Sequence, residues 1–433
     1  MNLLIRNGRL LDPAHRRDEV TDVLIENGKV ARIGRTLKAE GPKSDIQVID
    51  GTDRWVVPGL VDVHVHLREP GFEYKETIKT GTEAAAAGGF TSVCCMPNTQ
   101  PVNDNQAVTR LIREKARQEG RVHVFPIGAV TKDSKGEELA EIGELAEAGC
   151  VAITDDGKPV MNSGVMRRAM EYALAFDLPV IDHCEDEHLM DGGVMNEGVV
   201  SMELGLRGIP AAAEEVMVAR NLILAELTGA RLHLAHVSTA GSVRLIREAK
   251  SRGARVTAET CPHYFSLTEE AVRGYNTDAK MNPPLRTVQD RDAIRQGLKD
   301  GTLDVIATDH APHTEDEKNR EFDLAPFGIV GLETALPLTL RLVEEGVLSL
   351  DEAVAKLTVH PARVMRLNKG HLGIGADADL CLIEPEAAWT VEPARFHSKS
   401  RNTPFAGWRM KGLVAMTIVE GRVVYSTEEI RAV

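Results

Sequence analysis

Eight short apolar runs, each followed by a helix-like stretch, shape the chain from Val61 onward. The runs are rich in β-branched residues, and helical patterns such as Glu76–Ala87, Ala107–Gln118 and Ala213–Leu227 separate them. Parallel strands need such crossover connections, and eight strand-helix units close into a barrel. We therefore predict an α/β protein with a (β/α)8 TIM-like barrel. The eight runs are Val61–His66, Thr91–Met96, Val122–Ile127, Val151–Asp156, Pro179–His183, Leu232–Val237, Arg255–Thr260 and Asp304–Asp309.

Both ends of the chain depart from this alternation and consist of short strands and turns. Near the N-terminus, Asn27-Gly28 joins two strand-like runs, and both positions accept the positive φ of a hairpin turn. After a helical stretch over Leu350–Arg366, strand patterns return at Ala378–Ile383 and Ala415–Tyr425. Because chain ends usually lie together at the surface, we expect both termini to build one small β-sandwich domain.

The length of 433 residues fits this division, since a barrel of this kind needs roughly 250 residues. We place the barrel at residues 58–364 and the β-sandwich at residues 1–57 and 365–433. The net charge of -14 would repel a phosphate backbone, which argues against nucleic-acid binding. No signal-peptide pattern and no membrane-length apolar run occur, and the six cysteines form no C-x-x-C pair. We expect a cytoplasmic protein that does not bind membranes.

The first barrel run ends in His64-Val65-His66. Side chains alternate across a strand, so the two histidines point to the same side, into the mouth of the barrel, where barrel enzymes place their active sites. This geometry suits a metal ion. Taken alone, the motif would equally fit two half-buried histidines of a strand.

Metal-ligand residue types recur where four other runs end, at Asp155-Asp156, His183, His236 and Asp309. Nitrogen and carboxylate oxygen are the atoms that Zn²⁺ accepts in catalytic sites, and burying so many polar groups without a metal would leave them uncompensated. A zinc ion lowers the pKa of bound water to about 7 and polarises a carbonyl, while a nearby carboxylate can move the proton. Asp309 is our candidate for that proton shuttle.

Several motifs together resemble the dihydroorotases of the amidohydrolase superfamily, in their bacterial type I form, over essentially the whole chain. Single motifs of this set also occur in allantoinases and dihydropyrimidinases, but the combination is specific. The motifs run from Val61 to Gly71, Met96 to Thr99, Thr154 to Gly157, Asp182 to Asp186, His236 to Thr239, Lys280 to Arg286 and Ala307 to His313.

The resemblance implies a dihydroorotase reaction, the zinc-dependent and reversible cyclisation of N-carbamoyl-L-aspartate to (S)-dihydroorotate in pyrimidine biosynthesis. It implies two Zn²⁺ ions per chain, bridged by Asp156. The first would be held by His64, His66, Asp156 and Asp309, and the second by Asp156, His183 and His236. The residues implied to contact the substrate are Arg68, Asn98 and His313 at its carboxylate, and Asn282, Phe327 and Gly328 along its ring.

The fourth strand departs from the wider superfamily. Many relatives bridge their metals there with a carbamylated lysine, whereas this chain has aspartates, and Lys158 comes two residues too late. The type I pattern uses aspartate, so this agrees with the narrower resemblance. Two alternatives stay open: Asp155 could replace Asp156, and one or both metal positions could be filled.

The other histidines, Cys184 and two charged runs are not predicted to bind metal or substrate. We assign no function to lone histidines such as His123 and His233, and we expect His263 and His310 to orient ligands. Cys184 is interpreted as packing. We expect Glu73, Lys75 and Glu76 to be a solvated helix start, and Glu315–Lys318 to be a solvated loop or a mobile lid.

Two other functions share parts of this sequence pattern. The first is another cyclic amidase, an allantoinase or dihydropyrimidinase, but an arginine at Arg68 fits a substrate that carries a carboxylate. The second is a catalytically silent barrel that serves aspartate transcarbamoylase as a structural partner, which the full set of ligand residues disfavours. A complex with that enzyme in addition to catalysis stays an option, and we expect a homo-oligomer.

Overall fold

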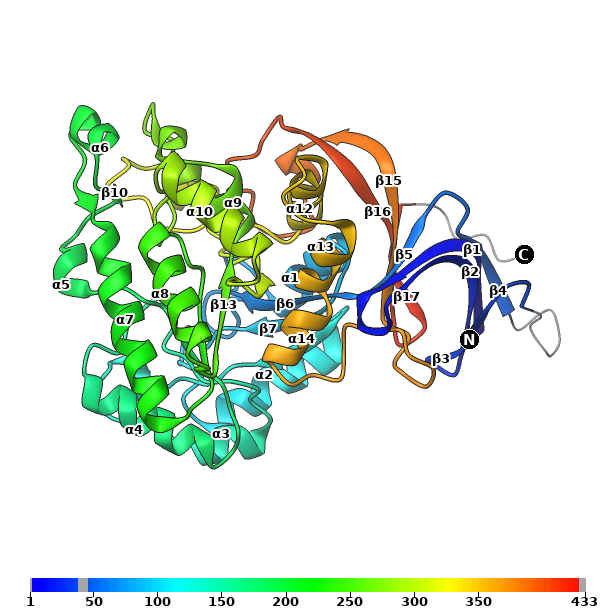
Figure 1. Ribbon diagram of the computed structural model, residues 1–433, viewed down its shortest axis with the longest axis horizontal. Coiled ribbons are helices and arrows are strands. Elements are labelled where there is room, and N and C mark those ends of the chain that lie inside the picture. The colour runs from blue at the N-terminus through cyan, green and yellow to red at the C-terminus, as the bar shows by residue number, and fades with distance from the viewer. Residues whose placement is uncertain (1, 38–45, 428–433) are drawn as a thin grey trace.

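The computed structural model describes residues 2–37 and 46–427, and its two regions lie side by side (Figure 1). A barrel surrounded by helices forms one region. A β-sheet region carries both ends of the described chain, next to α12 (Ala335–Glu344) and α13 (Leu350–Leu357). Of the predicted small domain, residues 1, 38–45 and 428–433 lie outside the described residues.

The barrel is closed and parallel, as predicted. One sheet has the order β6-β7-β8 and another the order β14-β13-β12-β9. Ile153 bridges β8 to β9 through Gly128 and Val180, and Val65 bridges to His310 to close the ring. The strands are β6 (Leu60–Val65), β7 (Phe90–Cys95), β8 (His123–Pro126), β9 (Val180–Asp182), β12 (Leu232–Leu234), β13 (Val256–Thr260) and β14 (Val305–Ile306).

The fourth predicted strand is reduced to the bridges of Ile153. Its next residues turn away from the ladder because the carboxylate of Asp155 accepts the backbone N–H groups of Val130 (2.8 Å) and Thr131 (3.0 Å). The side chain thereby replaces ladder hydrogen bonds. The strand is shorter than predicted, but its place in the barrel is correct.

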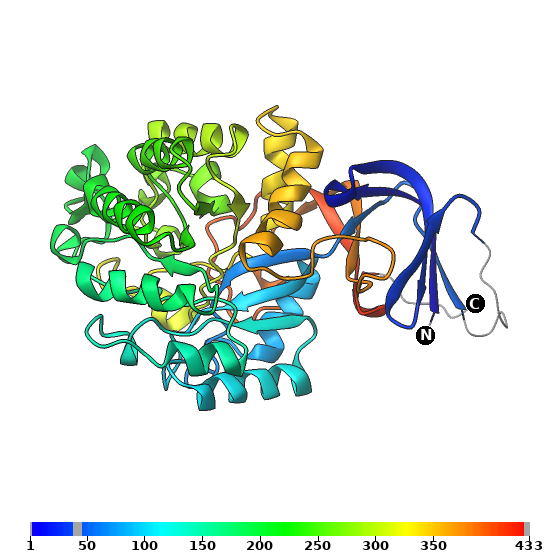
Figure 2. The ribbon, with the colours of Figure 1, turned by 60° about the horizontal axis from the view of Figure 1, so that its bottom comes forward.

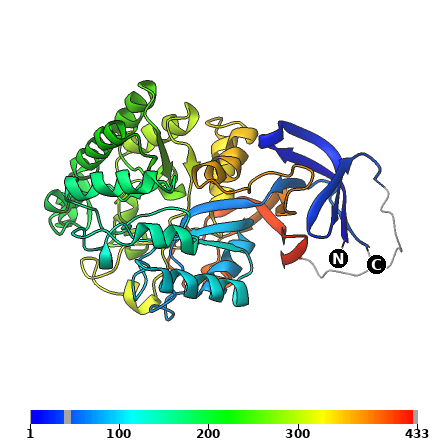
Figure 3. The same ribbon diagram turned by 90° about the horizontal axis from the view of Figure 1, so that it is seen from below.

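Helices cover the outside of the barrel (Figures 2 and 3). The first begins two residues later than predicted, because Thr77 and Thr80 form a capping box that starts the helix at Ile78. The helical stretch over 350–366 is interrupted at Thr358, since Pro361 has no N–H to continue the first helix. The longer helices are α1 (Ile78–Ala87), α2 (Gln106–Glu119), α3 (Ile142–Ala148), α4 (Ser163–Leu174), α7 (Ala211–Thr228), α8 (Ala240–Ser251), α10 (Val288–Lys299), α12, α13 and α14 (Val359–Val364).

Shorter elements decorate the connections on the barrel. They are α5 (Glu187–Met190), β10 (Met195–Asn196), α6 (Val199–Leu204), β11 (Gly208–Ile209), α9 (Pro262–Ser266) and α11 (Glu315–Lys318). No helix of the described residues is long and apolar enough to cross a membrane.

Both termini contribute to one eight-stranded sheet. Its order is β17-β16-β15-β5-β1-β2-β3, with β4 paired to β1, and the two halves of the chain meet where Leu382 of β15 pairs with Val56 of β5. The predicted hairpin is present, with Asn27 and Gly28 at φ 51° and 76°. The exact domain boundaries stay a prediction. The strands are β1 (Asn2–Asp12), β2 (Arg17–Glu26), β3 (Lys29–Gly34), β4 (Ile46–Asp50), β5 (Trp55–Pro58), β15 (Leu380–Thr390), β16 (Arg409–Val419) and β17 (Arg422–Ser426).

The barrel interior is a packed core. Its apolar cluster takes side chains from the barrel strands, including Val63, Cys94, Ile181 and Val305, and also contains Val364 of α14. A core of this kind leaves space for chemistry only at the mouth, where the strands end. A separate apolar cluster fills the terminal sheet.

Candidate active site

The six predicted metal ligands converge at the carboxyl ends of the barrel strands. His64 lies near the end of β6 and His66 just beyond it, while His183, His236 and Asp309 follow β9, β12 and β14. Asp156 follows the bridge at Ile153. All six side chains are buried.

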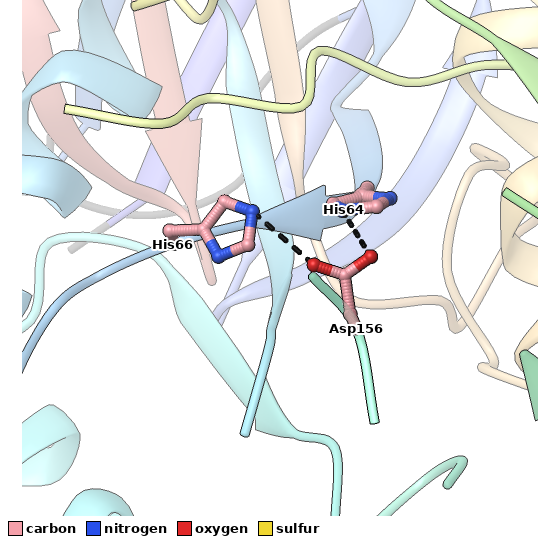
Figure 4. A group of neighbouring side chains, drawn as sticks. All are labelled: His64, His66 and Asp156. Carbon is pink, nitrogen blue, oxygen red and sulfur yellow. Dashed lines mark ion pairs between the residues drawn. The ribbon is translucent and has the colours of Figure 1, made fainter. Parts of the chain in front are cut away.

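Asp156 lies between two groups of histidines. On one side its carboxylate is 3.3 Å from His64 Nε2 and 3.5 Å from His66 Nε2 (Figure 4). On the other side it is 3.5 Å from His236 Nε2, which is 2.8 Å from His183 Nδ1. Among the described residues these are the two groups that could hold a metal ion, and they share Asp156.

Asp309 joins the first group. Its Oδ1 is 3.1 Å from His66 Nε2 and 3.5 Å from His64 Nε2. Burial opposes ionisation of this carboxyl, but the nearby His64 and His66 imidazoles outweigh it and hold its pKa below the usual range. Asp309 is therefore a carboxylate at neutral pH, able to accept a proton.

Unpartnered polar atoms test whether a metal fits. His64 Nε2 and Asp156 Oδ1 are buried and make no hydrogen bond, although they face each other. Buried polar atoms normally have partners, so atoms that converge without one indicate a cation-binding site. The donor set of imidazole nitrogen and carboxylate oxygen matches the ligands of catalytic zinc.

Glu259 on β13 orients the His64 imidazole, and it was not among the residues predicted from the sequence. Its Oε1 is 2.6 Å from His64 Nδ1, and its Oε2 is 3.0 Å from His233 Nε2. A carboxylate on Nδ1 directs the other nitrogen of His64 toward Asp156. His233, to which we assigned nothing, belongs to this arrangement. The available signal was an acidic residue inside a predicted barrel strand.

Asp155 does not replace Asp156. Its Oδ1 accepts the N–H groups of Val130 and Thr131, and its Oδ2 accepts the Thr131 hydroxyl. These bonds hold the loop after β8, so the carboxylate is occupied. Lys158 is exposed, in agreement with an aspartate at the bridging position.

A cavity of about 350 Å³ opens beside the cluster, and all six predicted substrate contacts line it. Arg68 donates from Nε to the Pro312 carbonyl (3.3 Å), and its Nη2 is 3.4 Å from His313 Nε2. Among the described residues this half-buried guanidinium has no carboxylate within ion-pair distance. The lining residues are His66, Arg68, Asn98, Asp156, Gly157, His183, His236, Asn282, Asp309, Ala311, His313, Pro326, Phe327 and Gly328.

Arg68 and His313 line the same cavity but differ in charge at neutral pH. Burial lowers the pKa of Arg68 to about 10, so it remains a cation at neutral pH. Burial, together with the charge of Arg68, depresses the pKa of His313 far below its usual range. His313 is therefore a neutral imidazole, and Arg68 is the charged group that an anion would meet.

The expectation of a solvated helix start over Glu73, Lys75 and Glu76 is wrong for two of the three residues. Glu73 is exposed, but Glu76 is fully buried and accepts from His310 Nε2 (3.3 Å). Lys75 is half-buried at the mouth, 3.3 Å from His313 Nδ1. Lys75 and Glu76 are covered because residues 398–400, between β15 and β16, form hydrogen bonds with them.

The expected orienting histidines take other places. His310 holds His66 through its backbone carbonyl (2.9 Å), whereas its imidazole turns to Glu76. His263 is buried, and its Nε2 has no hydrogen-bond partner. Cys184 packs as expected, with its thiol 3.3 Å from Asp182.

Comparisons with known proteins agree with this geometry. A family model described as Dihydro-orotase-like matches residues 53–242. The protein named Dihydroorotase in Syntrophotalea carbinolica is 61% identical over 425 residues, which cover 98% of this chain and 99% of that relative. The Dihydroorotase of Pelotomaculum thermopropionicum is 60% identical over 432 residues and 100% of both chains.

Solved structures show the same architecture. L-Hydantoinase (dihydropyrimidinase) from Arthrobacter aurescens has a TM-score of 0.88 at 25% identity, covering 99% of this chain and 97% of its own. Dihydropyrimidinase from Brevibacillus agri has a TM-score of 0.86 at 26% identity, covering 99% and 96%. These neighbours confirm the predicted fold class of a barrel with a β-sandwich domain. Given the identity to full-length relatives, the chain belongs to the dihydroorotase family.

Proposed function

We propose that this chain interconverts N-carbamoyl-L-aspartate with (S)-dihydroorotate and water, the third step of de novo pyrimidine biosynthesis. The observation that carries the proposal is a half-buried Arg68 without an acidic partner among the described residues, which lines the same cavity as the histidine-aspartate cluster. The cavity thus offers a cation for the substrate carboxylate beside the groups that would act on its amide.

We propose zinc as the metal, with two ions per chain. His64, His66, Asp156 and Asp309 would hold one ion, and Asp156, His183 and His236 would hold the other. Support comes from the two ligand groups that share Asp156. When bound, the metal supplies an activated water at neutral pH and polarises the amide carbonyl.

Asp309 would move the proton. In ring opening its carboxylate takes a proton as the amide carbon is attacked and returns it to the departing ring nitrogen. In ring closure the direction is reversed. Its depressed pKa and its place between the first histidine group and the cavity support this role.

The other lining residues would orient the substrate. Arg68, His313 and Asn98 would hold the carboxylate, with Arg68 supplying the charge. Asn282 donates to Glu185 (2.9 Å), while its Oδ1 is buried and without a partner, so it can accept from a ring N–H. Phe327 and Gly328 would form the wall along the ring.

The rival activities act on substrates that lack the carboxylate of dihydroorotate. Dihydropyrimidine and allantoin rings carry no carboxylate at the place where Arg68 would act, so these substrates would cover its charge and leave it unpaired. A silent barrel would have no use for a complete ligand set. Homo-oligomer formation, a complex with aspartate transcarbamoylase and a cytoplasmic location stay predictions.

Purified protein tests the proposal directly. We expect zinc-loaded enzyme to close N-carbamoyl-L-aspartate to dihydroorotate and to open dihydroorotate, with or without added aspartate transcarbamoylase. Metal analysis should find about two zinc ions per chain. Faster opening of dihydrouracil or allantoin than of dihydroorotate would contradict the assignment, and full activity with one ion would contradict the binuclear site.

A further inference from the structure

The loop that joins β15 to β16 leaves the terminal sheet and reaches the mouth of the barrel. Ser398 donates to the buried carboxylate of Glu76 (2.5 Å), and Ser400 donates to the Lys75 carbonyl (2.8 Å). The loop then brings Asn402 beneath the wall of the cavity. The terminal sheet thus extends into the surroundings of the active site.

Asn402 is buried, and its side-chain amide uses both N–H donors and its oxygen on two cavity segments. Its Oδ1 accepts from the backbone N–H of His313 (3.2 Å). Its Nδ2 donates to the carbonyls of Ala311 (3.1 Å) and Gly328 (3.0 Å). Its own carbonyl accepts from Val330 N–H (2.9 Å). One side chain therefore ties the segment after β14 to the loop around Gly328.

Arg68 contacts the same segment. It donates to the Pro312 carbonyl, between Ala311 and His313, which Asn402 holds. Besides the bond from Ala311 N–H to the Ile329 carbonyl, the backbone of 311–313 has two side-chain anchors. They are the guanidinium that would meet the substrate and an amide contributed by the distant loop. The position of His313 relative to Arg68 depends on both.

Lys318 supports the other segment. This lysine is buried, contrary to our expectation of a solvated loop, and its Nζ donates to the carbonyls of Pro326 (3.0 Å) and Gly328 (3.1 Å). Asn402 and Lys318 thus share the Gly328 carbonyl. Gly328 packs closely on the other segment, since a side chain there would meet Ala311 Cβ at 2.7 Å. The wall of the cavity is built as one hydrogen-bonded unit.

We propose that Asn402 is a positioning residue that sets the anion-binding half of the cavity, so that the β15–β16 loop contributes to substrate selectivity. The proposal rests on the proposed function. Removing the amide leaves the buried Ala311 carbonyl and His313 N–H without this partner, while the Gly328 carbonyl keeps Lys318. The 311–313 segment must then move to find new hydrogen bonds, and its tie to the loop around Gly328 is lost. Small displacements of groups that orient a substrate have large kinetic effects.

The test compares Asn402→Ala and Asn402→Ser with the unaltered enzyme on dihydroorotate and on dihydrouracil, which lacks the carboxylate. We expect KM for dihydroorotate to rise at least about tenfold, with kcat changed by less than about threefold. Zinc content should stay the same, and the preference for dihydroorotate over dihydrouracil should fall at least about tenfold. The serine variant, which keeps one hydroxyl, should show a smaller effect.

Asn196→Ala is the matched control. Asn196 is equally buried and bonds Glu269 (2.7 Å) and Arg286 (2.9 Å), neither of which lines the cavity. It should lose stability while KM remains unchanged. Unchanged KM in both Asn402 variants, or an equal loss on both substrates, would overturn the positioning role. Inactivity of the unaltered enzyme on dihydroorotate would instead contradict the proposed function.

Discussion

Two clusters of histidine and aspartate in this molecule have opposite character. The candidate metal cluster, His64, His66, Asp156, His183, His236 and Asp309, is buried at the carboxyl ends of the barrel strands. The joining cluster, His123, Lys369, Asp377 and Asp379, lies at the amino end of β8, where the barrel meets the terminal sheet.

The joining cluster supplies its own cation. Lys369 Nζ is 2.6 Å from Asp379, 2.8 Å from Asp377 and 2.9 Å from His123, so each acceptor has a partner. In the candidate metal cluster no lysine or arginine among the described residues lies within ion-pair distance of the two aspartates, and three buried atoms, His64 Nε2, Asp156 Oδ1 and His236 Nδ1, lack hydrogen bonds. The same residue types are structural where a side chain balances their charge, and they bind a ligand where none does.

Asp309→Asn should produce the largest effect. The amide has the same shape but cannot accept a proton, and acid-base assistance of this kind is typically worth about 10²–10⁴-fold in rate. We expect kcat to fall by that amount in folded protein. Zinc content must be measured in parallel, and a variant that keeps its metal and near-normal turnover would exclude Asp309 as the shuttle.

Arg68→Met should come next, because it removes the cation that faces the cavity. An unpaired substrate carboxylate in a desolvated site should cost about 2–5 kcal/mol in kcat/KM for dihydroorotate. Metal content and slow hydrolysis of dihydrouracil should survive. Equal losses on the two substrates would show that Arg68 supports the fold or the metal site.

Glu259→Gln should weaken metal binding, since an amide directs His64 less strongly than a carboxylate. Loss of such an orienting partner typically costs about 10–100-fold in metal affinity. Competition with a chelating dye measures it without an activity assay. Glu76→Gln is the control, because this buried carboxylate pairs with His310 and contacts no predicted ligand through its side chain. Equal affinities in the two variants would remove Glu259 from the site.

Lys369→Met should break the joining cluster and leave chemistry intact. Asp379 loses its cation, while Asp377 keeps its ion pair with Lys29. The free energy of unfolding should fall by about 1–3 kcal/mol, with kcat and zinc content unchanged. Burial opposes ionisation of Asp377, but Lys29 and Lys369 lower its pKa from 3.8 to about 2. Its contribution is complete above pH about 4 and is lost toward pH 2, so acid unfolding curves should converge there.

Bicarbonate should have no effect. An aspartate bridge needs no carbon dioxide, unlike a carbamylated lysine, and Lys158 is exposed. Zinc alone should restore stripped enzyme in buffer freed of carbon dioxide. A requirement for bicarbonate would reveal a modified lysine and would reopen the comparison with hydantoinases.

The sequence pattern predicted the barrel and the convergence of the six candidate ligands, for a simple reason. Periodicity of two and the common direction of parallel strands bring strand ends together whatever the details of packing. Glu259 and Asn402 escaped prediction because their partners lie 195 and 89 residues away in sequence, at His64 and His313. Glu259 stands out in the sequence as an acidic residue inside a predicted strand, but no local pattern identifies the distant partner of either residue.

The amino-acid sequence by itself determined the fold class, the residue types at the strand ends and the resemblance to dihydroorotases, since these depend on local periodicity and motifs. The tertiary structure decided which of two adjacent aspartates faces the histidines, because backbone N–H groups of the neighbouring strand end bind Asp155 and leave Asp156 free. It also decided that Glu76 and Lys318 are buried and that the terminal sheet reaches the active site. Such choices depend on hydrogen bonds between distant segments, and these exist only after the barrel has closed.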